Sequence, residues 1–294
     1  MSLSPSGAPR LNQALAAIDY LAIGHVTHDV RPDKSFTIGG TVSYAALTAA
    51  ALGRHVGILT SAGDDFDVAG FDGSVSVMCH RAEHTTTFTN TYVDGHRHQW
   101  VHSLADPLGQ ASVPAAWQHP RVVHIGPVIG ECDQALGQCF DGSTFVGVTP
   151  QGYMRSQGDD GKVWAHPWQV EPGLLMRASA VVFSLDDIQG DWQVAMRLAE
   201  RTRLLVVTLG ARGGVVFHDQ KATPFAALQV AEVDPTGAGD IFAATFFDAL
   251  AMGSPTMSAA RFAACLASRS VMRQGIDGVP GAEDVEVCQT LLEQ

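Results

Sequence analysis

The sequence predicts an α/β protein, a three-layer α-β-α sandwich built on a mostly parallel central sheet. Short runs of β-branched and aliphatic residues, typical of buried strands, alternate with longer stretches of helical period. The 294 residues are 46% hydrophobic and 16% charged, and so low a charged fraction indicates a large buried core. Since neither a linker-like stretch nor an internal repeat divides the chain, we expect residues 1–294 to form a single domain, with 1–18 as a flexible tail.

Six segments have the composition of buried strands, and helical stretches lie between most of them. The expected strands are 20–26, 55–60, 121–126, 143–149, 179–185 and 203–210, and the expected helices are 41–54, 132–140 and 187–202. Such a succession is typical of βαβ units, in which consecutive strands run parallel.

Other segments depart from this rhythm. Residues 85–103 alternate about Asp94-Gly95, a strong hairpin signal that predicts an antiparallel ribbon. A second strand pair is expected within 213–233. The chain then continues as two helices, 238–252 and 256–274.

Charge and cysteine content limit the partners. Thirty acidic and eighteen basic residues give a formal net charge of −12, which opposes non-specific binding to nucleic acid or to an anionic membrane. There is no apolar run of 18 residues and no signal-peptide pattern, so we expect a cytoplasmic protein. The five cysteines lack metal-type spacing, and we expect buried, reduced thiols at Cys79, Cys132, Cys139, Cys265 and Cys288.

The stretch DPTGAGD, residues 234–240, carries the clearest chemical signal. Small residues at 236–239 lead into an apolar helix, and a helix N-terminus offers unpaired N–H groups and partial positive charge to a phosphate. Asp240 at this junction is either a helix cap or a base that accepts a proton from an attacking hydroxyl. A helix cap needs only one such residue, whereas this stretch has five, namely Asp234, Thr236, Gly237, Gly239 and Asp240. The stretch therefore favours Asp240 as a base. Neither a Walker loop nor a dinucleotide-binding fingerprint is present.

DPTGAGDIF resembles the C-terminal signature of the ribokinase-like (PfkB-type) carbohydrate and nucleoside kinases. The resemblance extends from Ile23 to about Pro280. Residues 39–66 are similar to the N-terminal signature, 206–217 to the nucleotide-side strand and turn, and 262–280 to the helix and loop that close over adenine. The resemblance implies a small β lid near 29–38 and 85–103, reduced because the first of these segments is short.

The resemblance also implies roles for single residues. Asp240 is implied as the catalytic base, and the backbone amides of Gly237, Ala238 and Gly239 as the anion hole for the transferred phosphoryl group. The implied substrate-binding residues are Asp29, Gly39, Gly40, Tyr44, Gln151 and Arg155, and the implied nucleotide-binding residues are Thr208, Gly210 and Gly213. From the residues alone, turns explain Asp29 and the glycines, and an exposed loop charge explains Arg155.

The resemblance further implies ATP and Mg²⁺, with K⁺ in some members. Asp187 is implied to order Mg²⁺ through water, although Asp186 and Asp187 also suit the capping of the following helix. Asp234 and Thr236 match positions that hold a monovalent cation in some members of the family.

The acceptor is the least constrained part of the expectation. Tyr44 replaces the Asn of sugar-kinase relatives, and GVTPQGYMR at 147–155 resembles a stretch of plant-type myo-inositol kinases and their bacterial relatives. This implies an ATP-dependent kinase that phosphorylates a hydroxyl of a small polyol or sugar, with a myo-inositol-like cyclitol favoured. A nucleoside kinase and a non-catalytic sugar or nucleotide sensor are the alternatives, and the chain is expected to be a monomer or a homodimer.

Overall fold

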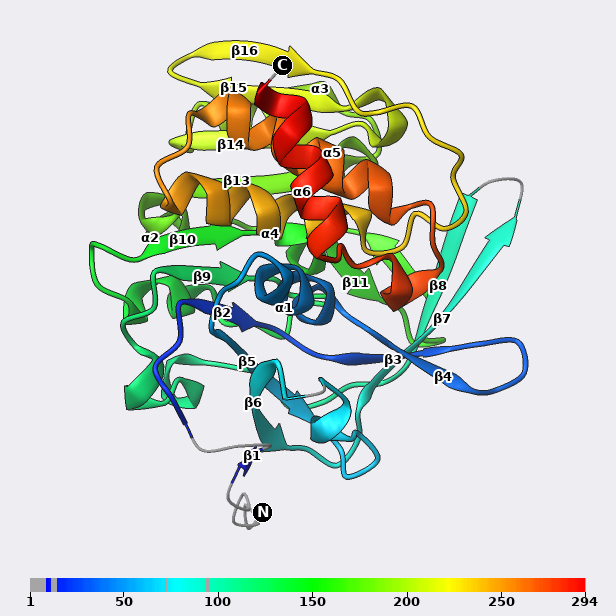
Figure 1. Ribbon diagram of the computed structural model, residues 1–294. Coiled ribbons are helices and arrows are strands. Elements are labelled where there is room, and N and C mark those ends of the chain that lie inside the picture. The colour runs from blue at the N-terminus through cyan, green and yellow to red at the C-terminus, as the bar shows by residue number, and fades with distance from the viewer. Residues whose placement is uncertain (1–8, 12–14, 72, 94–95, 294) are drawn as a thin grey trace.

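The computed structural model describes residues 9–11, 15–71, 73–93 and 96–293. Its main sheet has the order β1-β6-β5-β2-β9-β10-β13-β14-β15-β16 (Figure 1). The run from β6 to β14 pairs in parallel, whereas β1, β15 and β16 join antiparallel at the two edges. The bounds are β1 Arg10–Leu11, β2 Tyr20–Ile23, β5 Val56–Ala62, β6 Val75–Arg81, β9 Val122–Ile125, β10 Phe145–Val148, β13 Ala180–Ser184, β14 Leu204–Thr208, β15 Gly214–His218 and β16 Lys221–Phe225.

Helices cover both faces of this sheet, as the predicted three-layer sandwich requires. The helices α1 (Thr41–Ala51), α4 (Ala238–Ala251) and α5 (Thr256–Ser270) pack on one face, with α6 (Ala282–Glu293) outside α5. The helices α2 (Pro172–Arg177) and α3 (Trp192–Ala199) pack on the other face. Successive residues of a strand point to opposite faces, so alternate residues of β2 enter the two separate cores. No helix in the described part of the chain is long and apolar enough to cross a membrane.

A second, smaller sheet stands beside the carboxyl ends of the parallel strands (Figure 1). Its order is β4-β3-β7-β8, with the bounds β3 Thr27–Val30, β4 Phe36–Gly39, β7 Thr86–Val93 and β8 His96–Ser103. We call it the lid sheet. The antiparallel pairing of β7 with β8 confirms the predicted ribbon, although Asp94-Gly95 lies outside the described residues.

A short hairpin extends the lid sheet. It consists of β11 (Arg155–Gln157) and β12 (Val163–Ala165), which pair antiparallel. The amide of Val101 on β8 donates a 2.8 Å hydrogen bond to the carbonyl of Gly161 in the hairpin turn. The lid sheet therefore continues over the end of the main sheet.

The six predicted strands are confirmed, and so are the helices predicted at 41–54, 238–252 and 256–274, which end at Ala51, Ala251 and Ser270. One further predicted helix is shorter than expected, and another is a 3₁₀ segment. The segment expected as helix 187–202 is a 3₁₀ turn, Leu185–Ile188, followed by α3. Gln189 (φ 52°) and Gly190 (φ 80°) adopt left-handed conformations that interrupt a helix. The segment expected as helix 132–140 is a 3₁₀ segment, Gln134–Cys139. It contains Gly137, and glycine has low helix propensity.

The expectation of reduced thiols is wrong for two of the five cysteines. Cys265 on α5 and Cys288 on α6 form a disulfide with a Cα–Cα distance of 5.7 Å. Cys79 and Cys132 are buried free thiols, as expected, and Cys139 is a half-buried free thiol. A spacing of 23 residues carries no pairing signal in sequence, and the pair forms because α6 packs back on α5.

Loss of this disulfide is expected to lower stability. Replacing Cys288 by Ser opens a loop of 23 residues and should lower the free energy of unfolding by about 3 kcal/mol. Urea unfolding of the wild type and the variant, with and without a reducing agent, measures the effect. The reducing agent should lower the midpoint of the wild type only. An equal response of both proteins would contradict the disulfide.

Candidate active site

A cleft of about 1150 Å³ opens between the carboxyl ends of the parallel strands and the lid sheet. Ser184 ends β13 and Thr208 ends β14, and both line the cleft. Thr27 and Asp29 of β3 and Phe88 of β7 line it from the lid side. Ligands of open α/β sheets bind at this end of the strands.

Nearly all of the residues singled out in the sequence line this one cleft. They are Asp29, Gly40, Tyr44, Gln151, Arg155, Asp187, Thr208, Gly210, Gly213, Thr236, Gly237, Ala238, Gly239 and Asp240. Gly39 and Asp234 lie just behind the wall. A Cβ at Gly39 would stand 2.5 Å from Oδ2 of Asp29, and Asp234 accepts a 2.9 Å hydrogen bond from the amide of Thr236. The positions agree with the predicted roles, and the roles themselves stay predictions.

The start of α4 explains the small residues of the DPTGAGD motif. Gly237 is the N-cap of α4 in the left-handed region, with φ 79°. A Cβ there would stand 2.2–2.6 Å from three ring carbons of Tyr44, so the buried Tyr44 ring lies directly against the glycine. No atom lies within 4 Å of the position of a Cβ at Gly239. The backbone of this turn is therefore held from behind by Tyr44 and is open in front.

The amides of this turn are mostly outside the helical ladder. The first bond from one helical turn to the next runs from the amide of Ile241 to the carbonyl of Gly237, at 2.9 Å. The amide of Ala238 donates to the carbonyl of Pro235 at 3.2 Å. A helix leaves its first N–H groups without intrahelical partners, so the start of α4 is a suitable place for an anion.

Asp234 fixes the loop that precedes α4. Its carboxylate accepts from the amide of Thr236 at 2.9 Å and from the amide of Gly275 at 2.8 Å. Burial acts to raise the pKa of Asp234, but hydrogen bonding to the Thr236 side chain and to the amides of Thr236 and Gly275 outweighs it, and the pKa is lowered. The ionised carboxylate thus ties the loop to residue 275, and its predicted cation role stays a prediction.

Asp187 and Gln151 form one hydrogen-bonded unit at the edge of the cleft. Oδ2 of Asp187 accepts from the amide of Ser184, and Oδ1 accepts from Nε2 of Gln151, both at 2.9 Å. Ser184 and Asp187 together form a capping box on the 3₁₀ turn. Asp187 therefore caps the 3₁₀ turn, which is the alternative to metal binding that the sequence left open. Each carboxylate oxygen has a second lone pair, so a water-mediated contact with a metal ion is compatible with it.

The structure adds lining residues that sequence reasoning missed. Trp164 on β12 is 51% exposed and lines the cleft, with Nζ of Lys162 4.1 Å from its ring centroid. Gln99 lines the cleft from β8, and its Nε2 donates to Oδ1 of Asn90 at 3.0 Å. The one sequence signal for Trp164 is an aromatic residue in an otherwise polar hairpin. The pairing that brings it to the cleft is not visible in sequence.

The comparisons with known proteins agree with this geometry. The sequence pattern of the pfkB family of carbohydrate kinases matches residues 181–280. The chain is 25% identical to a cytidine kinase of Thermococcus kodakarensis over 262 residues. The aligned part covers 81% of this chain and 90% of the cytidine kinase.

Two solved structures show the same fold. A pyrophosphate-dependent kinase of the ribokinase family, complexed with a pyrophosphate analog and myo-inositol, is 23% identical with a TM-score of 0.78, over 91% of this chain and 99% of that chain. The ribokinase of Arabidopsis thaliana, complexed with ribose and ATP, is 18% identical with a TM-score of 0.68, over 95% of this chain and 100% of that chain.

Taken together, the family pattern over β13 to α5, the fold and the position of the DPTGAGD turn identify the kind of enzyme. It is a carbohydrate-kinase type of phosphotransferase, which acts on an alcohol group of its acceptor. Residues 181–280 thus match the pfkB family of carbohydrate kinases, and the chain as a whole has the ribokinase-like fold.

Proposed function

We propose that the protein is an ATP-dependent kinase that transfers the γ-phosphoryl group to a hydroxyl of a small polyol or sugar, with a myo-inositol-like cyclitol favoured. One observation carries the proposal. Asp240 and the first amides of α4 line the same cleft as Asp29 on the lid side and Thr208 on the opposite side. This lining supports a ternary complex in which an acceptor at Asp29 and a donor at Thr208 would meet at the start of α4.

The chemistry follows from this arrangement. The acceptor oxygen attacks the γ-phosphorus, its proton passes to the Asp240 carboxylate, and the bond to the β,γ-bridging oxygen breaks to release ADP. The amides at the start of α4 stabilise the negative charge that develops on the phosphoryl oxygens. Asp187 would hold Mg²⁺ through water, and the ion would neutralise charge on the donor phosphates.

The lining of the cleft favours a nucleotide over pyrophosphate as the donor. Among the described residues that line it, Arg155 is the one basic side chain. The acidic ones are Asp29, Asp186, Asp187, Glu232 and Asp240. Both donors present a polyanion to this acidic lining, but pyrophosphate has no other group with which to bind and so depends more on cationic side chains.

The donor end of the cleft also offers apolar surface to a base and a ribose. It is lined by Phe225, Ala227, Leu228, Val230, Ala264, Ala267 and Val271. Burial of a nucleobase against such side chains stabilises the complex, whereas pyrophosphate gains nothing from them. Pyrophosphate is the competing donor, because one structural relative is a pyrophosphate-dependent kinase.

The acceptor side is polar, which suits a compact polyhydroxyl compound. Thr27, Asp29, Gln99, Gln151 and Arg155 all line it. The carboxylate accepts from hydroxyl groups, the guanidinium donates to them, and the side-chain amides do both. Myo-inositol is bound by one structural relative of similar fold.

A nucleoside is the second candidate acceptor because of Trp164. An exposed indole at the rim of the cleft is a stacking surface for a base, and the curated relative is a cytidine kinase. Replacing Trp164 by Ala should then weaken the binding of cytidine more than the binding of myo-inositol. Phe at this position should retain the stacking and serve as the control.

A panel of donors and acceptors tests the proposal. ATP and pyrophosphate are each combined with myo-inositol, other polyols, sugars and cytidine in the presence of Mg²⁺, and kcat/KM is measured for every pair. We expect the highest value with ATP and a cyclitol. A higher value with pyrophosphate would overturn the donor, and a higher value with cytidine would establish the nucleoside acceptor instead.

A further inference from the structure

The strand β3 presents two different faces, and the cleft uses only one of them. Thr27 and Asp29 line the cleft, whereas His28 between them points to the opposite side of the lid sheet. Because His28 and Asp29 are neighbours on one short strand, a contact that fixes His28 also fixes the backbone that carries Asp29.

His28 is packed between the lid sheet and the body of the molecule. Its ring stacks on Phe36 of β4 at 4.8 Å and lies 5.9 Å from Phe66 of the loop after β5. The side chain is 10% exposed, and its Nδ1 is buried without a hydrogen-bond partner in the described residues. Oδ2 of Asp65 is 3.7 Å from this nitrogen, which exceeds hydrogen-bond distance by less than 1 Å.

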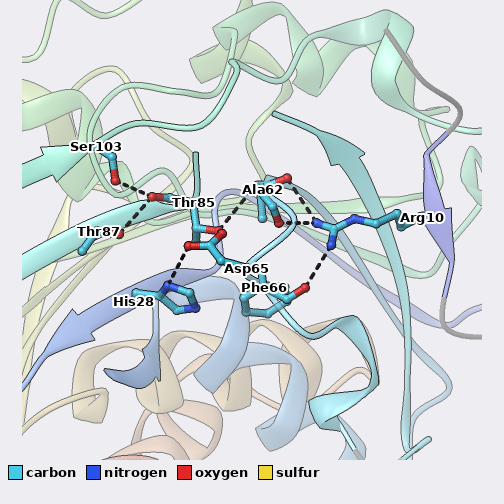
Figure 2. Close-up of polar contacts among 9 residues, drawn as sticks. Arg10, His28, Ala62, Asp65, Phe66, Thr85, Thr87 and Ser103 are labelled. Atoms are coloured by element: carbon cyan, nitrogen blue, oxygen red, sulfur yellow. Dashed lines mark hydrogen bonds and ion pairs between the residues drawn. The ribbon is translucent and has the colours of Figure 1, made fainter. Parts of the chain in front are cut away.

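Asp65 belongs to a junction that holds the lid to the body (Figure 2). Its Oδ1 accepts a hydrogen bond from the Thr85 hydroxyl, whose oxygen accepts from the amide of Gly63 at 3.1 Å. The carbonyl of Thr85 accepts from Thr87 of β7 at 3.0 Å and from Ser103 of β8 at 2.6 Å. The loop that carries Asp65 is therefore bonded to the ends of two lid strands.

The far side of the same loop is held by Arg10. Its guanidinium donates to the carbonyls of Ala62 at 3.1 Å, Gly63 at 2.7 Å and Phe66 at 3.0 Å (Figure 2). Three bonds from one side chain restrict the backbone of residues 62–66. The loop that carries Asp65 is thus held by Arg10 on one side and by Thr85 on the other, and the Asp65 side chain itself is 61% exposed.

We propose that His28 is a positioning residue for the phosphoryl acceptor: its protonated ring bonds to Asp65 from behind the lid sheet and thereby fixes Asp29 in the cleft. The inference rests on the proposed function, since Asp29 is its acceptor-binding residue. A charge-assisted hydrogen bond is shorter than the present 3.7 Å separation, so β3 moves slightly toward the loop when the bond forms.

The sign of the pH dependence follows from the surroundings of the ring. Burial lowers the pKa of His28 from the ordinary value of 6.5, and the Asp65 carboxylate opposes this shift. The hydrogen bond to Asp65 raises the pKa again when the acceptor is bound. Acceptor binding is therefore favoured fully below the pKa of the free enzyme, and the gain is lost as the pH rises through the higher pKa of the complex.

Asp65 is the charged group that acts on His28 among the described residues. The neighbouring Asp64 pairs with Arg81, and Asp67 accepts from the amide of Ala69. The packed strands β4 and β7 carry no charged residue in the sequences FTIG and TTFTNTYV. On β3 itself, Asp29 points to the cleft face.

Two substitutions of His28 separate positioning from packing. In His28→Asn the side-chain amide lies near the place of Nδ1 and donates to Asp65 at every pH. In His28→Phe the stacking on Phe36 is kept and the donor is lost. KM for the acceptor, tested with myo-inositol and cytidine, is measured from pH 5.5 to 8 for all three proteins.

Between pH 5.5 and pH 8 we expect the acceptor KM of the wild type to rise about tenfold more than the acceptor KM of His28→Asn. The Phe variant should show the high KM throughout, while kcat and KM for ATP stay within about twofold of the wild type. Comparison with the Asn variant at each pH removes any pH dependence that the two proteins share. Identical pH profiles of wild type and Asn variant would overturn the proposal.

A second measurement needs no acceptor, so it tests the contact of His28 with Asp65 independently of the proposed kinase function. NMR titration of the imidazole of His28 gives its pKa in the wild type and in Asp65→Asn. We expect a lower pKa in the variant, because a facing carboxylate is lost, and an unchanged pKa would overturn the contact. Absence of turnover with every donor and acceptor, together with the expected NMR shift, would refute the proposed function alone.

Discussion

Replacing Asp240 by Asn is expected to lower kcat by about 10² to 10⁴ while the protein stays folded. The substitution removes the carboxylate that accepts the acceptor proton and keeps the size and the helix-start position of the side chain. Asn is also a good residue near a helix N-terminus, so little stability should be lost. KM for both substrates should change by less than the rate.

Steady-state kinetics and circular dichroism measure this result. Asp219→Asn is the matched control, since Asp219 is an exposed turn residue with φ 49°, a conformation that Asn tolerates. The control should keep full activity. A turnover of Asp240→Asn within threefold of the wild type would refute the role of this carboxylate as the base.

Replacing Gly237 by Ala is expected to lower kcat/KM by about 10³, the second largest effect. The new Cβ would stand 2.2–2.6 Å from carbons of the Tyr44 ring, so either the ring or the start of α4 must move. An anion-hole donor is worth about 10² to 10³, and a displacement of 1 Å in an active site costs about 10². The left-handed φ of 79° adds strain for alanine.

Gly239→Ala separates this displacement from a simple steric block. No atom lies within 4 Å of its new Cβ, so stability should be unchanged and any loss of rate reports on the approach of the phosphoryl group. Shortening Tyr44 to Ala in the Gly237→Ala background should restore part of the activity. Full activity of Gly237→Ala alone would show that the turn does not contact the phosphoryl group.

The parts of the fold that sequence predicted are those with local signals. The strands β2, β9, β13 and β14 are buried on both faces, so their composition alone identifies them. The glycines before α4 mark its start in the same way. By contrast β6, which was not predicted, lies near the edge of the sheet, and β11 and β12 have three residues each.

The parts of the site that sequence could not predict depend on tertiary contacts. Trp164 reaches the cleft because its hairpin turn is bonded to β8, and Cys265 meets Cys288 because α6 folds back on α5. The predicted roles of Asp187 and Gln151 were assigned to separate ligands, yet the two side chains bond to each other. Such pairings have no periodicity or spacing that a single sequence displays.

The most direct test of the central claim is a crystal structure of Asp240→Asn with an ATP analogue, Mg²⁺ and the acceptor identified by the panel. We predict that the γ-phosphate lies on the amides at the start of α4 and that the reacting hydroxyl is about 3 Å from the side chain of residue 240. A γ-phosphate bound away from this helix, or a hydroxyl beyond the reach of residue 240, would contradict the account.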